Sequence, residues 1–313
     1  MRQSIDVILL TYKPDKQVLH ILKALEQQTY PVRKIIIINT EEAYFTALMK
    51  PAGLLERYPN IEVHHITAEA FDHGGTRQQA VMYSNADIFV CMTQDAVPAD
   101  KNLIKQLAEA LEGTPNAAVA YARQLPRTQC REIERYTRSF NYPDQSAVKS
   151  IEDIERLGIK TFFCSNVCAA YNRRIFDKLD GFVSRAIFNE DMIYAAKAVQ
   201  NHFKIVYAAK AQVIHSHNYT CMQQFRRNFD LGVSQAQHPE VFAGVSSQSE
   251  GMQLVKQTAK HLIESKKKRL IPMLILSSAY KYLGYQFGMH YKCLPYGIIR
   301  WCTSNPRYWK NAS

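Results

Sequence analysis

The sequence predicts an α/β fold built on a doubly wound, mostly parallel sheet. Strand-like apolar runs alternate with helical patterns through the first hundred residues, which is the order expected of such a sheet. One run, KIIIIN at residues 34–39, is almost wholly β-branched, as in central parallel strands covered on both faces. The length of 313 residues suits one large α/β domain with an appendage, or two domains.

The elements follow one another regularly. We expect strands at residues 5–10, 34–39, 61–66 and 87–92, separated by helices at residues 18–28, 43–57 and 76–84. In the second half we expect a helix at 102–113, a strand at 117–126, and a polar flap or substrate-facing insertion at 127–160. A strand and short helix within 161–182, a helix at 189–202 and strand structure at 204–219 follow. Ligands of such sheets bind beyond the carboxyl ends of the strands.

Composition narrows the class of protein. Hydrophobic residues make up 47% and charged residues 21%, as in folded soluble proteins. The seven cysteines include no C-x-x-C pair, so we expect reduced thiols and a cytoplasmic protein. The first apolar run is too short for a signal peptide and reads as a strand.

Polar residues stand at three strand ends, which in a parallel sheet would converge on one crevice. They are Thr11, Tyr12, Asn39, Thr40, Thr93, Gln94 and Asp95. A lone charge at the end of a buried strand is costly unless it is paired or binds a cation. Asp95 is therefore a candidate ligand of Mg²⁺ or Mn²⁺; the alternative is an Asx-turn or a helix N-cap.

Two further pairs of residues, one acidic and one of histidines, are candidate site residues. Glu190 and Asp191 open the helix at 189–202, where the helix dipole favours acids in any case, but one of them could be a general base for an incoming hydroxyl. His215 and His217 end an apolar strand, where residues two apart face the same side. Either could complete a metal shell with Asp95, or both could be surface imidazoles.

Phosphate recognition has no glycine-rich motif to support it. Neither GxGxxG nor GxxxxGK[ST] occurs, so a bound nucleotide would need a divalent cation. Arg77 follows Gly74-Gly75 near a helix N-terminus, where a guanidinium could clamp a diphosphate or simply be solvated.

The order of these motifs resembles the family 2 glycosyltransferases, and within them the bacterial rhamnosyltransferases of cell-surface polysaccharide synthesis. The matching stretches are VILLTYKPD, QQTYPVRKIIIIN, FDHGGTRQQAV, VCMTQDAVP, FNEDMIYAAKAV and VIHSHNYTCMQQFRRNFDLGV, between about residues 5 and 235. The resemblance implies a GT-A fold, with a Rossmann-like nucleotide-sugar half at residues 1–100 and an acceptor half at 101–240.

The resemblance also implies site roles. It implies that Thr11, Tyr12, Asn39, Thr40, Arg77, Gln94 and Asp95 bind the donor, and that Asp95 with His217 or His215 holds Mg²⁺ or Mn²⁺. Asp191 matches the base of the family's Glu-Asp pair, with Glu190 beside it. This chain has Thr93 where the family's D-x-D motif has its first acid, which puts metal dependence in question.

The basic charge is concentrated near the C-terminus. Residues 251–313 hold eleven Lys/Arg and one acid, hence ten of the eleven net positive charges. The apolar run Leu270–Tyr280 is shorter than the ~20 residues that span a bilayer, so we expect a basic, aromatic, helical segment that lies at a membrane interface. The alternative is a helical hairpin packed on the core with a basic outer face.

These inferences predict an inverting glycosyltransferase at the inner face of the bacterial cell membrane. The favoured donor is dTDP-β-L-rhamnose and the acceptor a hydroxyl of a lipid-linked saccharide, with no nucleic-acid partner. One alternative is the same fold with a UDP-hexose or UDP-N-acetylhexosamine donor. The other is a non-catalytic basic protein that binds membranes or RNA.

Overall fold

The computed structural model describes residues 2–245 and 248–311, which form two compact units. Unit 1 contains the chain up to Leu125, together with Tyr142–Ser184 and Glu190–His215. Unit 2 contains Pro126–Asn141, Arg185–Asn189 and the described residues from Ser216 onward.

A nine-stranded mixed sheet forms the centre of unit 1. Its parallel part runs in the order β3 (Ile61–Ile66), β2 (Lys34–Thr40), β1 (Ile5–Tyr12) and β4 (Ile88–Thr93). Next comes β8 (Cys168–Asn172), which is antiparallel to both of its neighbours. It is followed by β6 (Ala117–Leu125) and β9 (Lys204–Ile214), which are parallel to each other. The short strands β5 (Val97–Pro98) and β7 (Ala147–Lys149) both pair with β9. The predicted mostly parallel α/β sheet is confirmed.

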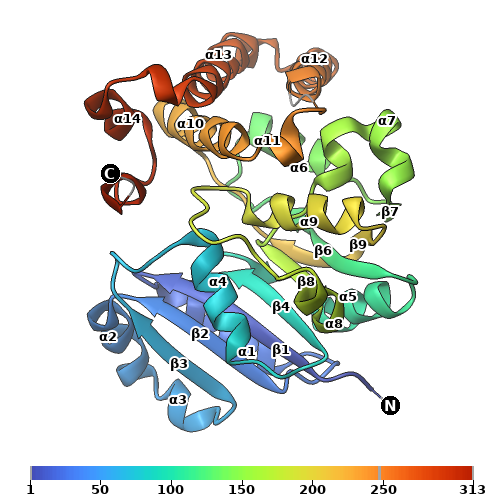
Figure 1. The fold of residues 1–313 in the computed structure, drawn as a ribbon, viewed down its shortest axis with the longest axis vertical. Helices are drawn as coiled ribbons and strands as arrows, with labels where there is room; N and C mark the ends of the chain where they lie inside the picture. Colours follow the sequence, from blue (N-terminus) through green and yellow to red (C-terminus); the bar gives the residue numbers. More distant parts are fainter. Residues whose placement is uncertain (1, 246–247, 312–313) are drawn as a thin grey trace. The chain divides into compact units, whose positions relative to one another are not determined.

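Helices flank this sheet, and Figure 1 shows α4 crossing in front of the strands β1 to β4. The helices of unit 1 are α1 (Lys16–Glu26), α2 (Glu42–Ala52), α3 (Leu54–Arg57), α4 (His73–Met82), α5 (Leu103–Glu112), α7 (Ile154–Leu157), α8 (Arg173–Lys178) and α9 (Glu190–Gln200). The single helix expected at 43–57 is instead two helices, because Gly53 adopts a left-handed backbone (φ 57°) that ends α2.

Two other expectations differ in detail. The strand expected within residues 161–182 begins only at Cys168, after a 3-10 turn at Gly158–Phe162. The expected flap at 127–160 contains the helix α6 (Glu132–Asn141). This helix was not predicted because its sequence is mostly charged and polar and has few apolar residues.

The core of unit 1 explains why the strands form where they do. β1, β2 and β4 are buried along nearly their whole length, so their apolar runs are covered on both faces. The helix α1 contributes Val18, Ile21, Leu22 and Leu25, spaced as one helical face, to the same core. This packing fixes the register in which Thr11 stands opposite Asn39, and Leu10 opposite Thr93.

Unit 2 is helical. It contains α6, α10 (Cys221–Gln237), α11 (Pro239–Phe242), α12 (Gln248–Glu264), α13 (Ile271–Met289) and α14 (Tyr296–Cys302), with 3-10 turns at Lys268–Leu270, Tyr291–Cys293 and Tyr308–Asn311. The helices α10 and α13 pack closely, and a Cβ added at Gly288 would lie 2.1 Å from the carbonyl oxygen of Phe229. Glycines at this contact allow the two backbones to touch (Figure 1).

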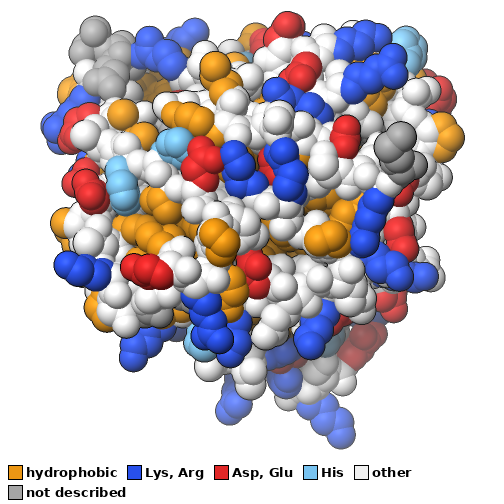
Figure 2. Space-filling model, turned by 90° about the horizontal axis from the view of Figure 1, so that it is seen from below, with side chains coloured by type: hydrophobic (Ala, Val, Ile, Leu, Met, Phe, Trp, Pro, Cys, Tyr) orange, Lys and Arg blue, Asp and Glu red, His pale blue; other side chains and the backbone are white. Residues whose placement is uncertain are grey.

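The basic C-terminal run therefore folds into helices. Within the residues that the structure describes, no helix is both long enough and apolar enough to cross a membrane. All of the apolar run Leu270–Tyr280 except Leu270 lies in the first half of α13. On the face drawn in Figure 2, by contrast, acidic and basic side chains are interspersed.

Candidate active site

The strand-end residues of β1 and β2 meet as predicted, and they are largely bonded to one another. Thr11 Oγ1 donates to Asn39 Oδ1 at 2.9 Å. The Asn39 amide donates to the Glu41 carbonyl oxygen and lies 3.0 Å from His65 Nδ1. Thr11, Asn39 and Thr40 are all buried. These buried residues form a floor at this end of the sheet, and their contact with a donor stays a prediction.

Tyr12 and Gln94 are the more exposed residues at these strand ends. The Gln94 side chain accepts from Tyr12 N–H and donates to Tyr12 C=O, both at 2.9 Å, which joins the ends of β1 and β4. The Tyr12 ring is 40% exposed and packs edge-to-face against Tyr44, also exposed. Two accessible aromatic rings of this kind could stack on a base.

Asp95 lies just beyond β4, and its carboxylate is held from two sides. Thr93 Oγ1 donates to Asp95 Oδ1 at 2.7 Å. His215 Nε2 lies 3.4 Å from the other oxygen, Oδ2. Thr93 thus orients the Asp95 carboxylate.

The other ring nitrogen of His215, Nδ1, is hydrogen-bonded to Gln124. Nδ1 lies 2.9 Å from Gln124 Oε1. The Gln124 amide nitrogen donates to Tyr142 Oη and Ser165 Oγ, so its oxygen faces the imidazole and Nδ1 carries the proton. Nε2 faces Asp95 and is the nitrogen that a neutral imidazole would offer to a metal, as in histidines whose outer hydrogen bond orients them.

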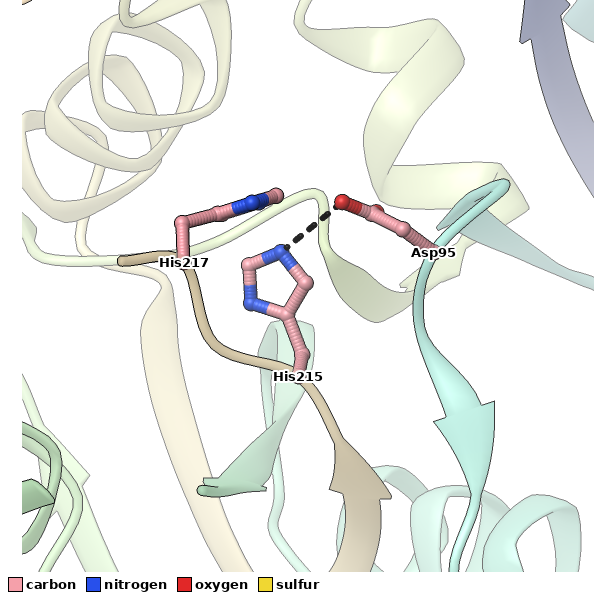
Figure 3. A group of neighbouring side chains, drawn as sticks. All are labelled: Asp95, His215 and His217. Atoms are coloured by element: carbon pink, nitrogen blue, oxygen red, sulfur yellow. Dashed lines mark ion pairs between the residues drawn. The ribbon is translucent and has the colours of Figure 1, made fainter. Parts of the chain in front are cut away.

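These side chains fit a divalent cation. Asp95, His215 and His217 each offer one ligand atom, and the three atoms lie within 4.8 Å of one another. Figure 3 shows the three side chains pointing toward one another. Asp95 Oδ2 and His215 Nε2 lie 3.4 Å apart, and one carboxylate with two imidazoles suits Mn²⁺ better than Mg²⁺.

The expected reason for this convergence was wrong in one respect. β9 ends at Ile214, so the two histidines lie after the strand rather than on it. Strand alternation therefore does not orient them. Instead, His215 N–H donates to the Leu125 carbonyl oxygen at 2.8 Å, which extends the β6–β9 pairing by one hydrogen bond.

In the second acidic pair, at the start of α9, Glu190 is buried and Asp191 is half-buried. Asp191 Oδ2 accepts from Asn166 N–H, and Oδ1 accepts from Met192 N–H, both at 2.8 Å. Glu190 accepts from the Asn166 amide at 3.0 Å. Asn166 therefore holds both carboxylates through its backbone and its side chain.

Arg77 forms the other half of this arrangement. Its guanidinium is 5% exposed, lies 2.9 Å from Glu190 Oε1 and donates to the His73 carbonyl oxygen. Arg77 thus compensates a buried acid from within α4. Its predicted contact with a diphosphate stays a prediction.

The surroundings shift the pKa values of Glu190 and Asp191 in opposite directions. Burial alone would raise the pKa of Glu190, but the Arg77 guanidinium, together with His73 and the hydrogen bond from Asn166, holds that pKa below its ordinary value. Burial and then the charge of Glu190 raise the pKa of Asp191 to about 7. A carboxyl with a pKa near neutrality is matched to proton transfer, so of the two Asp191 is suited to act as a base.

Both acidic groups lie at the same end of the sheet. Thr93 N–H, at the end of β4, donates to the Val167 carbonyl oxygen at 3.2 Å. The preceding residue, Asn166, binds Asp191. A short path of hydrogen-bonded residues thus joins Asp95 to Asp191 across the boundary between β4 and β8.

The sequence analysis missed the residues that support these groups. Gln124 and Asn166 are buried polar residues that orient His215 and Asp191. Gln124 interrupts the apolar strand β6, which is a signal that the sequence offered. Lys149 is also buried, donates to the carbonyl oxygens of Lys160 and Phe163, and has its pKa lowered to about 7 by burial.

Comparison with known proteins assigns the chain to a family. Residues 6–180 match the model of "Glycosyl transferase family 2". The chain belongs to that family. The matched region runs from β1 to the end of α8, so it includes Asp95, whereas α9 and the histidines lie beyond it.

Two curated relatives cover almost the whole family 2 chain. It is 38% identical over 312 residues to the O-antigen chain rhamnosyltransferase RfbN of Salmonella typhimurium, covering 98% of this chain and 96% of the relative. It is 36% identical over 292 residues to the O-antigen chain rhamnosyltransferase WbaN of Salmonella anatum, covering 92% and 90%. The chain is a glycosyltransferase.

Solved structures of other transferases share the GT-A fold of this family 2 enzyme. A mannosyltransferase from Pyrobaculum calidifontis, in complex with GDP-Man and Mn²⁺, matches with TM-score 0.59 and 14% identity over 93% of this chain and 88% of its own. TarS of S. aureus, in complex with UDP-GlcNAc, matches with TM-score 0.50 and 14% identity over 92% and 91%. At this identity the likeness concerns the fold.

Proposed function

We propose that this family 2 enzyme is an inverting rhamnosyltransferase. It transfers L-rhamnose from dTDP-β-L-rhamnose to a hydroxyl of a lipid-linked saccharide during surface polysaccharide synthesis. The observation that carries the proposal is the near full-length relationship to two O-antigen chain rhamnosyltransferases. The arrangement around Asp191 supplies chemistry consistent with it.

Asp191 acts as the base. Its ionised carboxylate takes the proton of the acceptor hydroxyl while that oxygen bonds to the anomeric carbon. The bond from this carbon to the diphosphate oxygen breaks, and the nucleoside diphosphate leaves with the electron pair. Because attack is opposite to the leaving group, a β-linked donor gives an α-linked product. Asn166 and Met192 direct Asp191 through two backbone hydrogen bonds, which supports a fixed orientation.

Asp95, His215 and His217 would hold Mn²⁺ or Mg²⁺ next to the donor diphosphate. Such an ion, when bound, neutralises the charge that develops on the leaving group. Thr93 and Gln124 keep Asp95 and His215 aimed at that position. Tyr12 and Gln94, with the floor formed by Thr11, Asn39 and Thr40, lie where the nucleoside would bind.

The domain assignment follows from these roles. We assign residues 1–100 to donor binding, 101–240 to acceptor binding and 251–313 to association with the inner face of the cell membrane, where a lipid-linked acceptor resides. Arg77, placed beside Glu190, serves this scheme by keeping Glu190 ionised, so that Asp191 alone titrates near neutrality.

A panel of nucleotide sugars tests the donor. Purified protein with Mn²⁺ is heated alone and with dTDP-rhamnose, UDP-galactose, UDP-N-acetylglucosamine or GDP-mannose, since a ligand of the native state raises the melting temperature. We expect the largest shift with dTDP-rhamnose, and release of dTDP when lipid-linked saccharide is added. A larger shift with a UDP-sugar would assign the enzyme to that donor and reject rhamnosyl transfer.

A further inference from the structure

The helix α13 has an unusual distribution of side chains within unit 2. Toward α10 it presents small groups, since a Cβ added at Gly284 or Gly288 would lie 2.2 or 2.1 Å from a carbonyl oxygen of α10. Its opposite side is apolar and open to solvent, with Ile275 62% exposed and Leu283 49% exposed. A soluble surface helix normally shows the reverse pattern.

The open side continues from α13 to α14. The rings of Phe287 and Trp301 both pack against Phe225, each with 5.9 Å between ring centroids, so these two exposed aromatics border the same buried ring. We name the α13–α14 apolar face for the following exposed residues: Ile275, Leu276, Tyr282, Leu283, Phe287 and Trp301. Large exposed apolar faces of this kind mark interaction sites.

Basic residues border this face. Lys266, Lys268 and Arg269 are exposed directly before α13, and Arg300 is exposed beside Trp301. From Ser265 to the end of the chain there is no acidic residue.

We infer that the α13–α14 apolar face docks on an anionic phospholipid membrane, with its apolar side chains at the boundary between headgroups and acyl chains. Exposed Tyr282 and Trp301 suit that depth, where aromatic rings are enriched. The basic border suits anionic headgroups. A second copy of the chain fits less well, because the stretch from Ser265 onward contributes cations and no acid that could pair with them across a symmetric contact.

This inference rests on the proposed function, because a lipid-linked acceptor requires the enzyme at a membrane, and it names the surface that holds the enzyme there. It deepens the expectation of a membrane-interface segment by selecting one side of α13. The other side is occupied by α10 and is unavailable.

Vesicle co-sedimentation of the full-length protein tests the inference. The probes are phosphatidylcholine vesicles and vesicles of phosphatidylcholine mixed with phosphatidylglycerol. We expect binding to the anionic vesicles only, weakening as salt is added. The double variant Ile275→Asp/Leu283→Asp should reduce partitioning by about tenfold or more, since it removes two inserted side chains.

Controls separate docking from general surface effects. Met82→Asp changes a 76% exposed apolar side chain of unit 1 and should sediment like the unaltered protein. The triple variant Lys266→Gln/Lys268→Gln/Arg269→Gln should bind anionic vesicles less and lose much of the salt dependence. Both sets of changes lie on the surface, so the melting temperature should not fall.

Three results would overturn the inference. They are unchanged sedimentation of the Ile275→Asp/Leu283→Asp variant, equal binding to neutral vesicles, or a dimer in light scattering that this variant dissociates, which would assign the face to a second copy. The donor panel needs no membrane, so a failure of rhamnosyl transfer and a failure of docking remain distinguishable.

Discussion

Asp191→Asn should separate activity from stability in this enzyme. The substitution removes the carboxylate proposed as the base and keeps its size and one of its hydrogen bonds. Loss of a positioned general base lowers the rate by about 10²- to 10⁴-fold. We therefore expect kcat/KM for rhamnosyl transfer to fall within that range.

At high pH the Asp191→Asn variant should be at least as stable as the unaltered enzyme, although it is less active. Burial and the charge of Glu190 raise the pKa of Asp191 from 3.8 to about 7, so the ionised carboxylate disfavours the native state by about 4 kcal/mol well above that pH. Asparagine carries no such charge. It loses one acceptor for the N–H groups of Asn166 and Met192, which costs about 1–3 kcal/mol. The melting temperature at pH 8 should then stay level or rise.

The assay combines initial rates with thermal unfolding between pH 5.5 and 9. In the unaltered enzyme kcat/KM should rise with pH through a midpoint near 7, because only ionised Asp191 accepts a proton. Asp180→Asn is the matched control, since Asp180 is 89% exposed and should change neither quantity. Full activity in Asp191→Asn, or equal loss of activity and stability at pH 8, would refute the reasoning.

Further predictions concern the neighbouring acid, the cation site and unit 2. Glu190→Gln should move the acid limb of the pH–rate profile to lower pH, because it removes the charge that raises the pKa of Asp191; an unmoved limb contradicts this. Chelation of divalent ions should lower transfer in the unaltered enzyme and have little further effect on Asp95→Asn, and a variant still stimulated by Mn²⁺ would argue against the site. Gly288→Ala should cost about 1–3 kcal/mol of unfolding free energy, because its Cβ would lie 2.1 Å from a carbonyl oxygen of α10. Gly297→Ala is the control and should be neutral, because nothing lies within 4 Å of its Cβ. Equal melting temperatures of the two variants would show that α10 and α13 can separate at little cost.

Much of the parallel half could be read from the sequence. The runs at 34–39 and 88–92 are so apolar that only a strand covered on both faces accommodates them, and the polar residues after them had to collect at one edge of the sheet. The helix break at Gly53 and the charged helix α6 were harder, because a positive φ and a weak apolar pattern leave little local signal.

The chain by itself determined which segments become strands and helices and which side chains stand at their ends, since those properties depend on patterns a few residues long. Only the tertiary structure decided that Arg77 compensates Glu190, that Gln124 orients His215 and that α13 turns its apolar side outward. The partners in the first two contacts lie about a hundred residues apart, and the side of α13 that is covered depends on how closely α10 approaches its glycines. Such choices follow from strand order, register and helix contact, which no local window contains.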